Sequence, residues 1–147
     1  MKKHLWAVAT LLAMAAFGNS TSSWSADAAS DAAQVKLQAA AILKLQAAAA
    51  GAAGSAVKDI EIKSTAHMVT VVVINNKLNT GAAADREGNA ARISASIARL
   101  IDGKKGFSQV AAIHVDYVMR PGSDDAKLIQ GFDFFKSPAG AFAPNKS

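Results

Sequence analysis

Hydrophobic residues recur with the spacing of an amphipathic helix between residues 82 and 102. At about 100° per residue they form one apolar stripe, with a polar stripe beside it and small residues on the third side. Thr80 is placed to cap the N-terminus of this helix, and Gly103 follows its end. The pattern therefore predicts a helix whose core-facing positions are Ala90, Ile93, Ile97, Leu100 and Ile101.

A second helix is predicted by composition more than by periodicity. Residues 31–50 are rich in alanine, leucine, lysine and glutamine, which are strong helix formers, and a pattern of six residues beginning at Lys36 recurs at Lys44. Gly51 and Gly54 predict the end of this helix. Its apolar stripe is thin and consists of Val35, Ile42, Leu43 and Leu45.

Stretches rich in β-branched and aromatic residues predict three or four strands. Residues 68–74 are apolar on both faces of a strand, which is typical of a central strand that is covered on both sides. Residues 110–120 and 127–135 are separated by a short loop that contains glycine, and this spacing predicts a hairpin. Alternation of Ile60 and Ile62 with charged residues extends the β-rich stretch to residue 57, and residues 63–66 either turn the chain between two strands or bend a single one.

The order of these elements predicts an α+β fold of two layers, in which a mixed sheet of three or four strands carries both helices mainly on one face. We expect a signal peptide at 1–28, an Ala-rich helix and Gly/Ala linker at 29–56, an α+β core at 57–136 and an irregular C-terminal tail at 137–147. Two strands also carry apolar residues for the opposite face. We therefore expect the tail or a second copy to cover that face, and we predict homodimerisation through it.

The first 28 residues have the order of a secretory signal peptide, with a basic head, an apolar run at residues 5–17 and a small-residue cleavage site. The apolar run is shorter than the roughly 20 residues that a bilayer span needs. The chain has no cysteine, which excludes disulfides, thiolate metal sites and the lipid anchor of a bacterial lipoprotein. We expect a mature periplasmic or secreted protein without a transmembrane segment.

The formal net charge of +5 does not by itself indicate a nucleic-acid partner. Proteins that bind nucleic acids cluster their basic residues on one face or in a tail. Here the longest basic run in the predicted mature chain is Lys104–Lys105, and acidic residues are interleaved elsewhere. We therefore expect the partner to be a protein, including a second copy of this chain, rather than a nucleic acid.

Candidate catalytic chemistry is concentrated in the strand predicted at residues 110–120. His114 and Asp116 project from the same face of that strand, because side chains alternate along it. An imidazole beside a carboxylate can serve acid–base catalysis or hold a metal, and His67 would complete a candidate ligand set if its strand lies alongside. Cross-strand hydrogen bonding is the plainer interpretation of the same residues. The sequence contains no nucleophile elbow, phosphate-binding loop or zinc-protease motif, and no cofactor is expected.

The C-terminal half also offers an aromatic candidate surface. Its phenylalanines lie on both faces of one predicted strand, where core packing or partner binding can use them. The candidate binding residues are Arg120, Phe132, Phe134 and Phe135. Taken together, the sequence predicts an exported, non-enzymatic interaction or structural module of the bacterial envelope or exterior. The alternative is a small hydrolase or metal-dependent protein that uses His114 and Asp116.

Overall fold

The computed structural model describes residues 21–122 and 125–145, and it describes side chains at Lys36 and from Gln38 onward within these ranges. The chain divides into two compact units, residues 1–35 and Lys36–Ser147, and the description below concerns the second. The basic head and apolar run of the predicted signal peptide lie outside the described residues. In chain order the elements are α1 (Thr21–Ala53), η1 (Val57–Asp59), β1 (Ile60–Ser64), β2 (Met68–Ile74), η2 (Lys77–Thr80), α2 (Ala83–Ile101), η3 (Lys105–Phe107), β3 (Ala112–Met119), β4 (Lys127–Lys136) and β5 (Phe142–Pro144).

The strands form one mixed sheet in the order β1-β2-β3-β4-β5. Only β2 and β3 run parallel, joined through α2, and the other neighbouring pairs are antiparallel. This confirms the predicted α+β class, but the described sheet has five strands rather than three or four. The additional strand, β5, lies in the segment predicted to be an irregular tail. Its three residues pair with the end of β4 at the sheet edge, where a proline such as Pro144 is tolerated.

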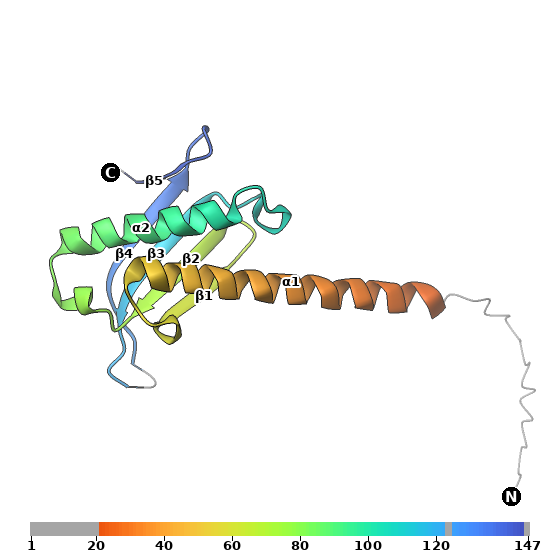
Figure 1. Ribbon diagram of the computed structural model, residues 1–147, viewed down its shortest axis with the longest axis horizontal. Coiled ribbons are helices and arrows are strands. Elements are labelled where there is room, and N and C mark those ends of the chain that lie inside the picture. Colours follow the sequence, from red (N-terminus) through yellow and green to blue (C-terminus); the bar gives the residue numbers. More distant parts are fainter. Residues whose placement is uncertain (1–20, 123–124, 146–147) are drawn as a thin grey trace, which may run out of the picture. The chain divides into compact units, whose positions relative to one another are not determined.

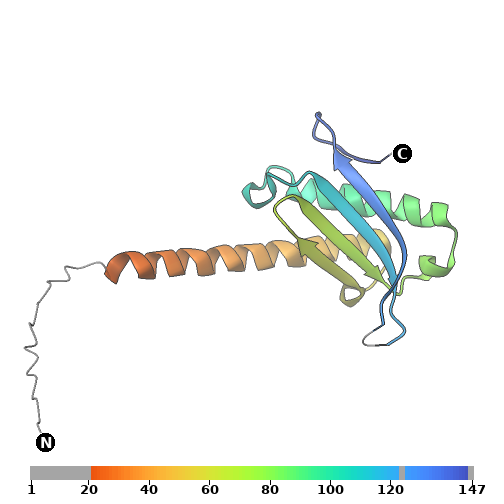
Figure 2. The same cartoon turned by 180° about the vertical axis from the view of Figure 1, so that it is seen from behind.

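Both helices pack on one face of the sheet (Figure 1), and the view from behind shows the other face of the sheet without a helix on it (Figure 2). The predicted stripe of α2 is buried except at Leu100, which lies at its edge and is exposed. From α1, three buried alanines join the same core as the strand residues, so a helix with few large apolar residues still contributes to it. The core joins Leu45, Ala49, Ala50, Ala53, Ala90, Ile93, Ile97 and Ile101 of the helices to Ile60, Val69, Val71, Val73, Ile113, Val115, Tyr117 and Phe134 of the strands.

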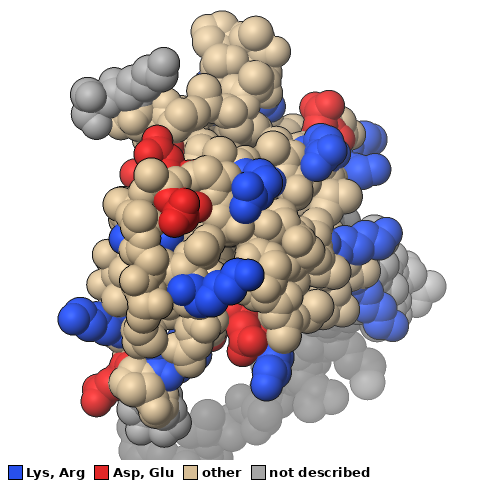
Figure 3. All heavy atoms as spheres, turned by 60° about the vertical axis from the view of Figure 1, so that its left-hand side comes forward, with Lys and Arg blue, Asp and Glu red and all other residues tan. Residues whose placement is uncertain are grey.

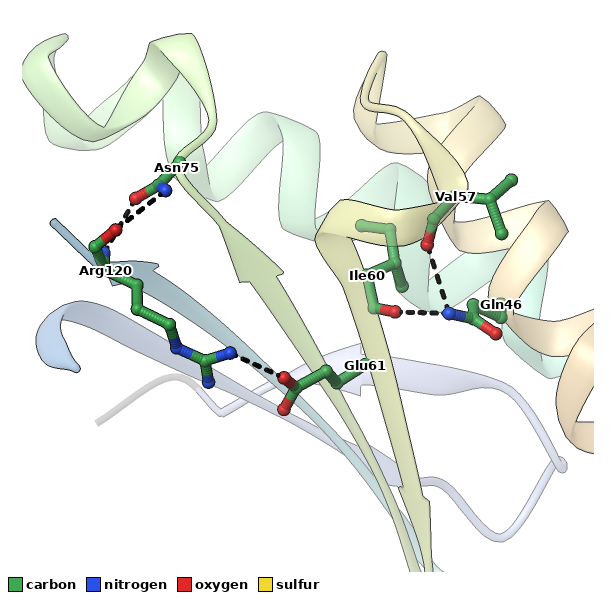
Figure 4. Close-up of polar contacts among 6 residues, drawn as sticks. All are labelled: Gln46, Val57, Ile60, Glu61, Asn75 and Arg120. Carbon is green, nitrogen blue, oxygen red and sulfur yellow. Dashed lines mark hydrogen bonds and ion pairs between the residues drawn. The ribbon is translucent and has the colours of Figure 1, made fainter. Parts of the chain in front are cut away.

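A side-chain amide joins α1 to the beginning of β1. Gln46 Nε2 donates to the carbonyl oxygens of Val57 at 3.1 Å and Ile60 at 2.6 Å (Figure 4). The Val57 carbonyl also accepts from the N–H of Ile60, whereas Ile60 lies on β1, which pairs with β2 alone, so the amide gives its carbonyl a partner in place of a further strand. Gln46 therefore fixes where β1 begins relative to the helix.

Asparagines hold the connection from β2 to α2. Asn76 Nδ2 donates to the Ala53 carbonyl at the end of α1, and Asn79 Nδ2 donates to the Val118 carbonyl of β3. The predicted capping by Thr80 is wrong, because Thr80 belongs to η2 and the N-cap of α2 is Ala82, which makes no side-chain capping bond.

Among the described residues, no helix combines the length and the apolar character needed to cross a membrane.

Candidate functional site on the uncovered face of the sheet

The face of the sheet opposite the helices carries the candidate chemistry, and we call it the open face. The strand register aligns its side chains in rows, one of which runs Lys63, Thr70, His114, Asp133 from β1 to β4. The next row runs Glu61, Val72, Asp116, Gly131. The remaining open-face residues are Met68, Ile74, Ala112, Val118, Arg120, Leu128 and Phe135.

His114 lies between two carboxylates. Its Nδ1 is 2.6 Å from Asp133 Oδ1, and its Nε2 is 2.8 Å from Asp116 Oδ1. Ionised carboxylates only accept hydrogen bonds, whereas a neutral imidazole has one donor nitrogen and one acceptor nitrogen. Both contacts are therefore satisfied only when the imidazole is protonated on both nitrogens.

The charges around His114 act in the same direction as this geometry. Partial burial is the largest single influence and lowers the pKa of His114. Hydrogen bonds to Asp133 and Asp116, with the attraction of their charges, together outweigh burial and raise the pKa above its ordinary value of 6.5. The cluster Asp116–His114–Asp133, which we call the carboxylate–histidine triad, is thus arranged to hold an imidazolium.

Gly131 provides the space that the triad occupies. A Cβ atom at Gly131 would lie 2.8 Å from Asp116 Oδ1 and 3.2 Å from His114 Nε2. Glycine in a strand often marks such a close approach of another group to the backbone. The absence of a side chain on β4 therefore permits the hydrogen bond between Asp116 and His114.

A second polar contact crosses the open face next to the triad. Arg120 extends from the end of β3 across β2, and its Nη1 donates to Glu61 Oε1 on β1 at 2.9 Å (Figure 4). Asn75 fixes the main chain of Arg120 with two hydrogen bonds, of 2.7 Å and 3.0 Å. On the same face is a small buried cluster of Val72, Ile74 and Val118. Since its residues lie on β2 and β3, which this contact crosses, the long Arg120 side chain is placed to shield them from water.

Large apolar side chains are exposed at the margins of the open face. Leu128 and Phe135 on β4 keep 58% and 48% of their surface accessible, and Met68 at the start of β2 is also exposed. An apolar side chain left in water does not stabilise the fold, whereas its burial against a partner lowers the free energy of the complex. The open face therefore combines exposed apolar side chains with fixed charges of both signs.

The structure brings together only part of the predicted catalytic and metal set. His114 and Asp116 are in contact as expected, but the ring of His67 lies 3.4 Å from the Gln109 carbonyl instead. His67 precedes Met68, so strand alternation directs it away from the face that carries His114. Across the described ranges, no group of three or more histidine, aspartate or glutamate side chains is arranged to hold a metal ion.

The predicted binding residues separate onto two faces. Arg120 and Phe135 belong to the open face, whereas Phe134 is buried under the helices. Phe132 packs edge-to-face on Tyr117, with ring centroids 6.1 Å apart, on the helix side. Phe132 and Phe134 therefore serve the core, and of the three phenylalanines only Phe135 is available to a partner.

The residues that sequence reasoning missed are Asp133, Gly131 and Glu61. Each lies on a strand other than β3, so its neighbour on the open face is set by strand register rather than by sequence spacing. The only local signal was Gly131, a glycine inside a strand pattern, which indicates a close approach without naming the group that approaches. The triad could not be assembled before the register was known.

A buried polar cluster lies on the helix side of the sheet. Arg86 donates at 2.8 Å to Gln130 Oε1 and to the carbonyls of Leu78 and Gly81, and Tyr117 donates to Asn89 Oδ1 at 2.7 Å. Burial raises the pKa of Tyr117 to about 12, and nearby arginines oppose that shift only in part. The phenol therefore stays protonated at neutral pH. This cluster joins α2 to β3 and β4 and presents no reactive group to solvent.

No family model, curated protein or solved structure matches this chain. An α+β fold assigns no chemistry by itself, because function depends on the particular side chains of a site.

Figure 3 shows one side of the molecule, on which basic and acidic side chains are interspersed rather than gathered by sign.

Proposed function

We propose that this chain is an exported, non-enzymatic interaction module that acts through the open face of its sheet, and that a second copy of the chain covers this face. The observation that carries the proposal is the one-sided arrangement of the layers, with exposed Leu128 and Phe135 on the side without helices. Two-layer domains ordinarily place the exposed side of a sheet in water with polar side chains. Large apolar residues there favour a partner.

The alternation of charge across the sheet favours a second copy as that partner. A two-fold axis between β2 and β3, parallel to the strands, would lay β1 of one copy over β4 of the other. Within one row this brings Lys63 opposite Asp133, and it brings Thr70 opposite His114. Opposite charges therefore meet in both halves of the interface, as an isologous contact requires.

The C-terminal tail is a poor candidate to cover the open face. Its β5 pairs edge-on with β4, and Phe142 packs against the core on the helix side. Two sheets packed face to face would instead bury Met68, Leu128 and Phe135 in the ordinary sandwich arrangement. Helices would then lie on both outer sides of the dimer.

A second candidate function is a small hydrolase or metal-dependent protein, which the 2.8 Å contact between His114 and Asp116 favours. The other ring nitrogen of His114 contacts Asp133. His114 is therefore better placed to remain a charged imidazolium than to accept a proton from a substrate. The two functions differ in what His114→Ala does. Loss of a cellular activity with dimerisation intact would favour the enzyme, and loss only where dimerisation is also lost would favour the interaction module.

Sedimentation velocity of the purified chain at micromolar concentration tests the proposal. We expect a dimer for the wild type and a monomer for Leu128→Glu/Phe135→Glu, because each copy would bury two carboxylates without partners. Leu43→Glu/Val57→Glu is the matched control. Its side chains are 64% and 48% exposed but lie on α1 and η1, so this variant should remain dimeric.

Two results would contradict self-association through the open face. The first is a wild-type chain that sediments as a monomer at these concentrations. The second is a control variant that dissociates as fully as the Leu128→Glu/Phe135→Glu variant. Circular dichroism of both variants shows whether the fold is retained, since all four substituted side chains are exposed.

A further inference from the structure

A groove away from the open face is enclosed by two segments that are distant in sequence. Residues 98–108, at the end of α2 and in η3, form one side, and Lys136 with the hairpin between β4 and β5 forms the other. The groove has a volume of about 580 Å³, within the range of small-molecule sites. It shares no residue with the open face.

Local backbone geometry builds both walls of the groove. Gly103 adopts φ +65° after α2, which turns the chain into η3 and places Lys104, Lys105 and Phe107 beside the helix end. Gly140 adopts φ +86° and closes the hairpin that returns β5 along β4. Positive φ angles of this kind favour glycine. The segment predicted as an irregular tail thus forms one side of a concave site.

The lining of the groove has two parts. Ile101, Phe107 and Phe142 supply apolar surface that is continuous with the core. The charged lining residues are four cations and one acid: Arg99, Lys104, Lys105, Lys136 and Asp102. Within the described ranges, none of the four cations forms an ion pair with a carboxylate.

One cation lies next to the apolar surface. Lys136 Nζ lies 6.0 Å from the centre of the Phe142 ring, at the limit of a cation–π contact. This contact places a positive charge directly beside an apolar wall. An anionic group bound by Lys136 would therefore have its apolar body against Phe142.

We propose that this groove binds a single-chain anionic amphiphile, with its acidic head at the lysines and its alkyl chain along Ile101, Phe107 and Phe142. A purely polar anion would leave the apolar lining uncovered, and an uncharged alkyl chain would leave the cations unpaired. The proposed occupant is a free amphiphile rather than a membrane surface, because the lining residues form a concave groove of limited volume.

Isothermal titration with dodecanoate, below its micelle concentration, tests this site in the full chain. We expect saturable binding of one dodecanoate per chain and no binding of dodecyltrimethylammonium, which has the same alkyl chain and the opposite charge. Lys104→Glu/Lys105→Glu should weaken dodecanoate binding about tenfold, because two attractions become repulsions. Lys58→Glu/Lys77→Glu makes the same change of charge on exposed sites outside the groove and should leave the affinity unchanged.

A second variant separates ligand binding from a structural role of the lysines, since basic residues beside a helix C-terminus stabilise the helix by themselves. Ala139→Trp fills the groove from the exposed hairpin without changing any charge. It should lower the affinity for dodecanoate and leave the melting temperature unchanged.

Three outcomes would overturn the proposal. These are the absence of saturable dodecanoate binding, an equal loss of affinity in Lys58→Glu/Lys77→Glu, and binding to anionic phospholipid vesicles without binding to monomeric dodecanoate. Sedimentation of the ligand-free chain reports on the open face independently, so failure of the groove and failure of dimerisation can be distinguished.

Discussion

At the scale of single residues, the open face is organised by a residue without a side chain. Gly131 faces the Asp116–His114 contact across the register between β3 and β4. Alanine is ordinarily better tolerated than glycine in a strand, because glycine loses more conformational entropy on folding. At Gly131 we expect the steric demand of the triad to reverse that preference, because an added Cβ would lie 2.8 Å from Asp116 Oδ1.

Gly131→Ala tests this steric requirement. We expect it to lower the free energy of unfolding by about 1–2 kcal/mol, because the new methyl group displaces Asp116 from His114. The pKa of His114, followed by NMR, should also fall towards its ordinary value, since one of its two hydrogen bonds is lost.

The matched control is Gly88→Ala, at a helical position with no atom within 4 Å of the added Cβ. In the middle of α2, alanine should stabilise the protein by about 0.5–1 kcal/mol. A Gly131→Ala variant that is stabilised to the same degree, with an unchanged His114 pKa, would show that the triad does not need the space at Gly131.

At the scale of secondary-structure elements, the repeated pattern in α1 places two glutamines in different environments. Gln38 and Gln46 occupy equivalent positions of the two copies, eight residues apart in the printed sequence. Gln38 is exposed, whereas Gln46 binds the carbonyls of Val57 and Ile60. The sequence predicted the helix from both copies equally, but only the tertiary structure distinguishes their roles.

Gln46→Ala should therefore destabilise the fold where Gln38→Ala does not. We expect a loss of about 1–2 kcal/mol in the free energy of unfolding, because the Ile60 carbonyl loses its side-chain donor and the Val57 carbonyl keeps only the N–H of Ile60. Gln38→Ala should change stability by less than about 0.5 kcal/mol, as exposed helix positions usually do. Urea unfolding followed by circular dichroism measures both, and equal effects would contradict the role assigned to Gln46.

At the scale of the whole molecule, the triad makes stability depend on pH. The pKa of His114 is raised in the folded chain, so the folded state binds this proton more tightly than the unfolded state does. The stabilisation is complete below the ordinary value of 6.5, and it is lost as the pH rises through the raised value. Higher pH therefore weakens the fold in this interval, provided that the triad stays intact.

Urea unfolding at a series of pH values, from just below 6.5 upward, measures this effect. The midpoint of unfolding should decline with pH in the wild type and decline less in His114→Gln, which cannot hold an imidazolium. The difference between the two proteins isolates His114 from other titrating groups. Parallel curves for the two proteins would show that His114 contributes no such linkage.

The sequence by itself determined the class of the fold and most of its elements. The period of α2, the alanine content of α1 and the β-branched stretch at β2 are local signals, because they arise from residues a few positions apart. The pairing of His114 with Asp116 was also local, since both lie on β3. The sequence did not predict β5, because its three residues have no strand pattern of their own and form a strand only by pairing with β4.

Only the tertiary structure decided which distant residues meet. Strand register brought Asp133 and Gly131 to His114, and it carried Arg120 across β2 to Glu61. It also directed Phe132 and Phe134 into the core and left Phe135 exposed on the open face. Such assignments depend on contacts between separate strands and helices, because a shift of one residue in register turns every side chain to the opposite face.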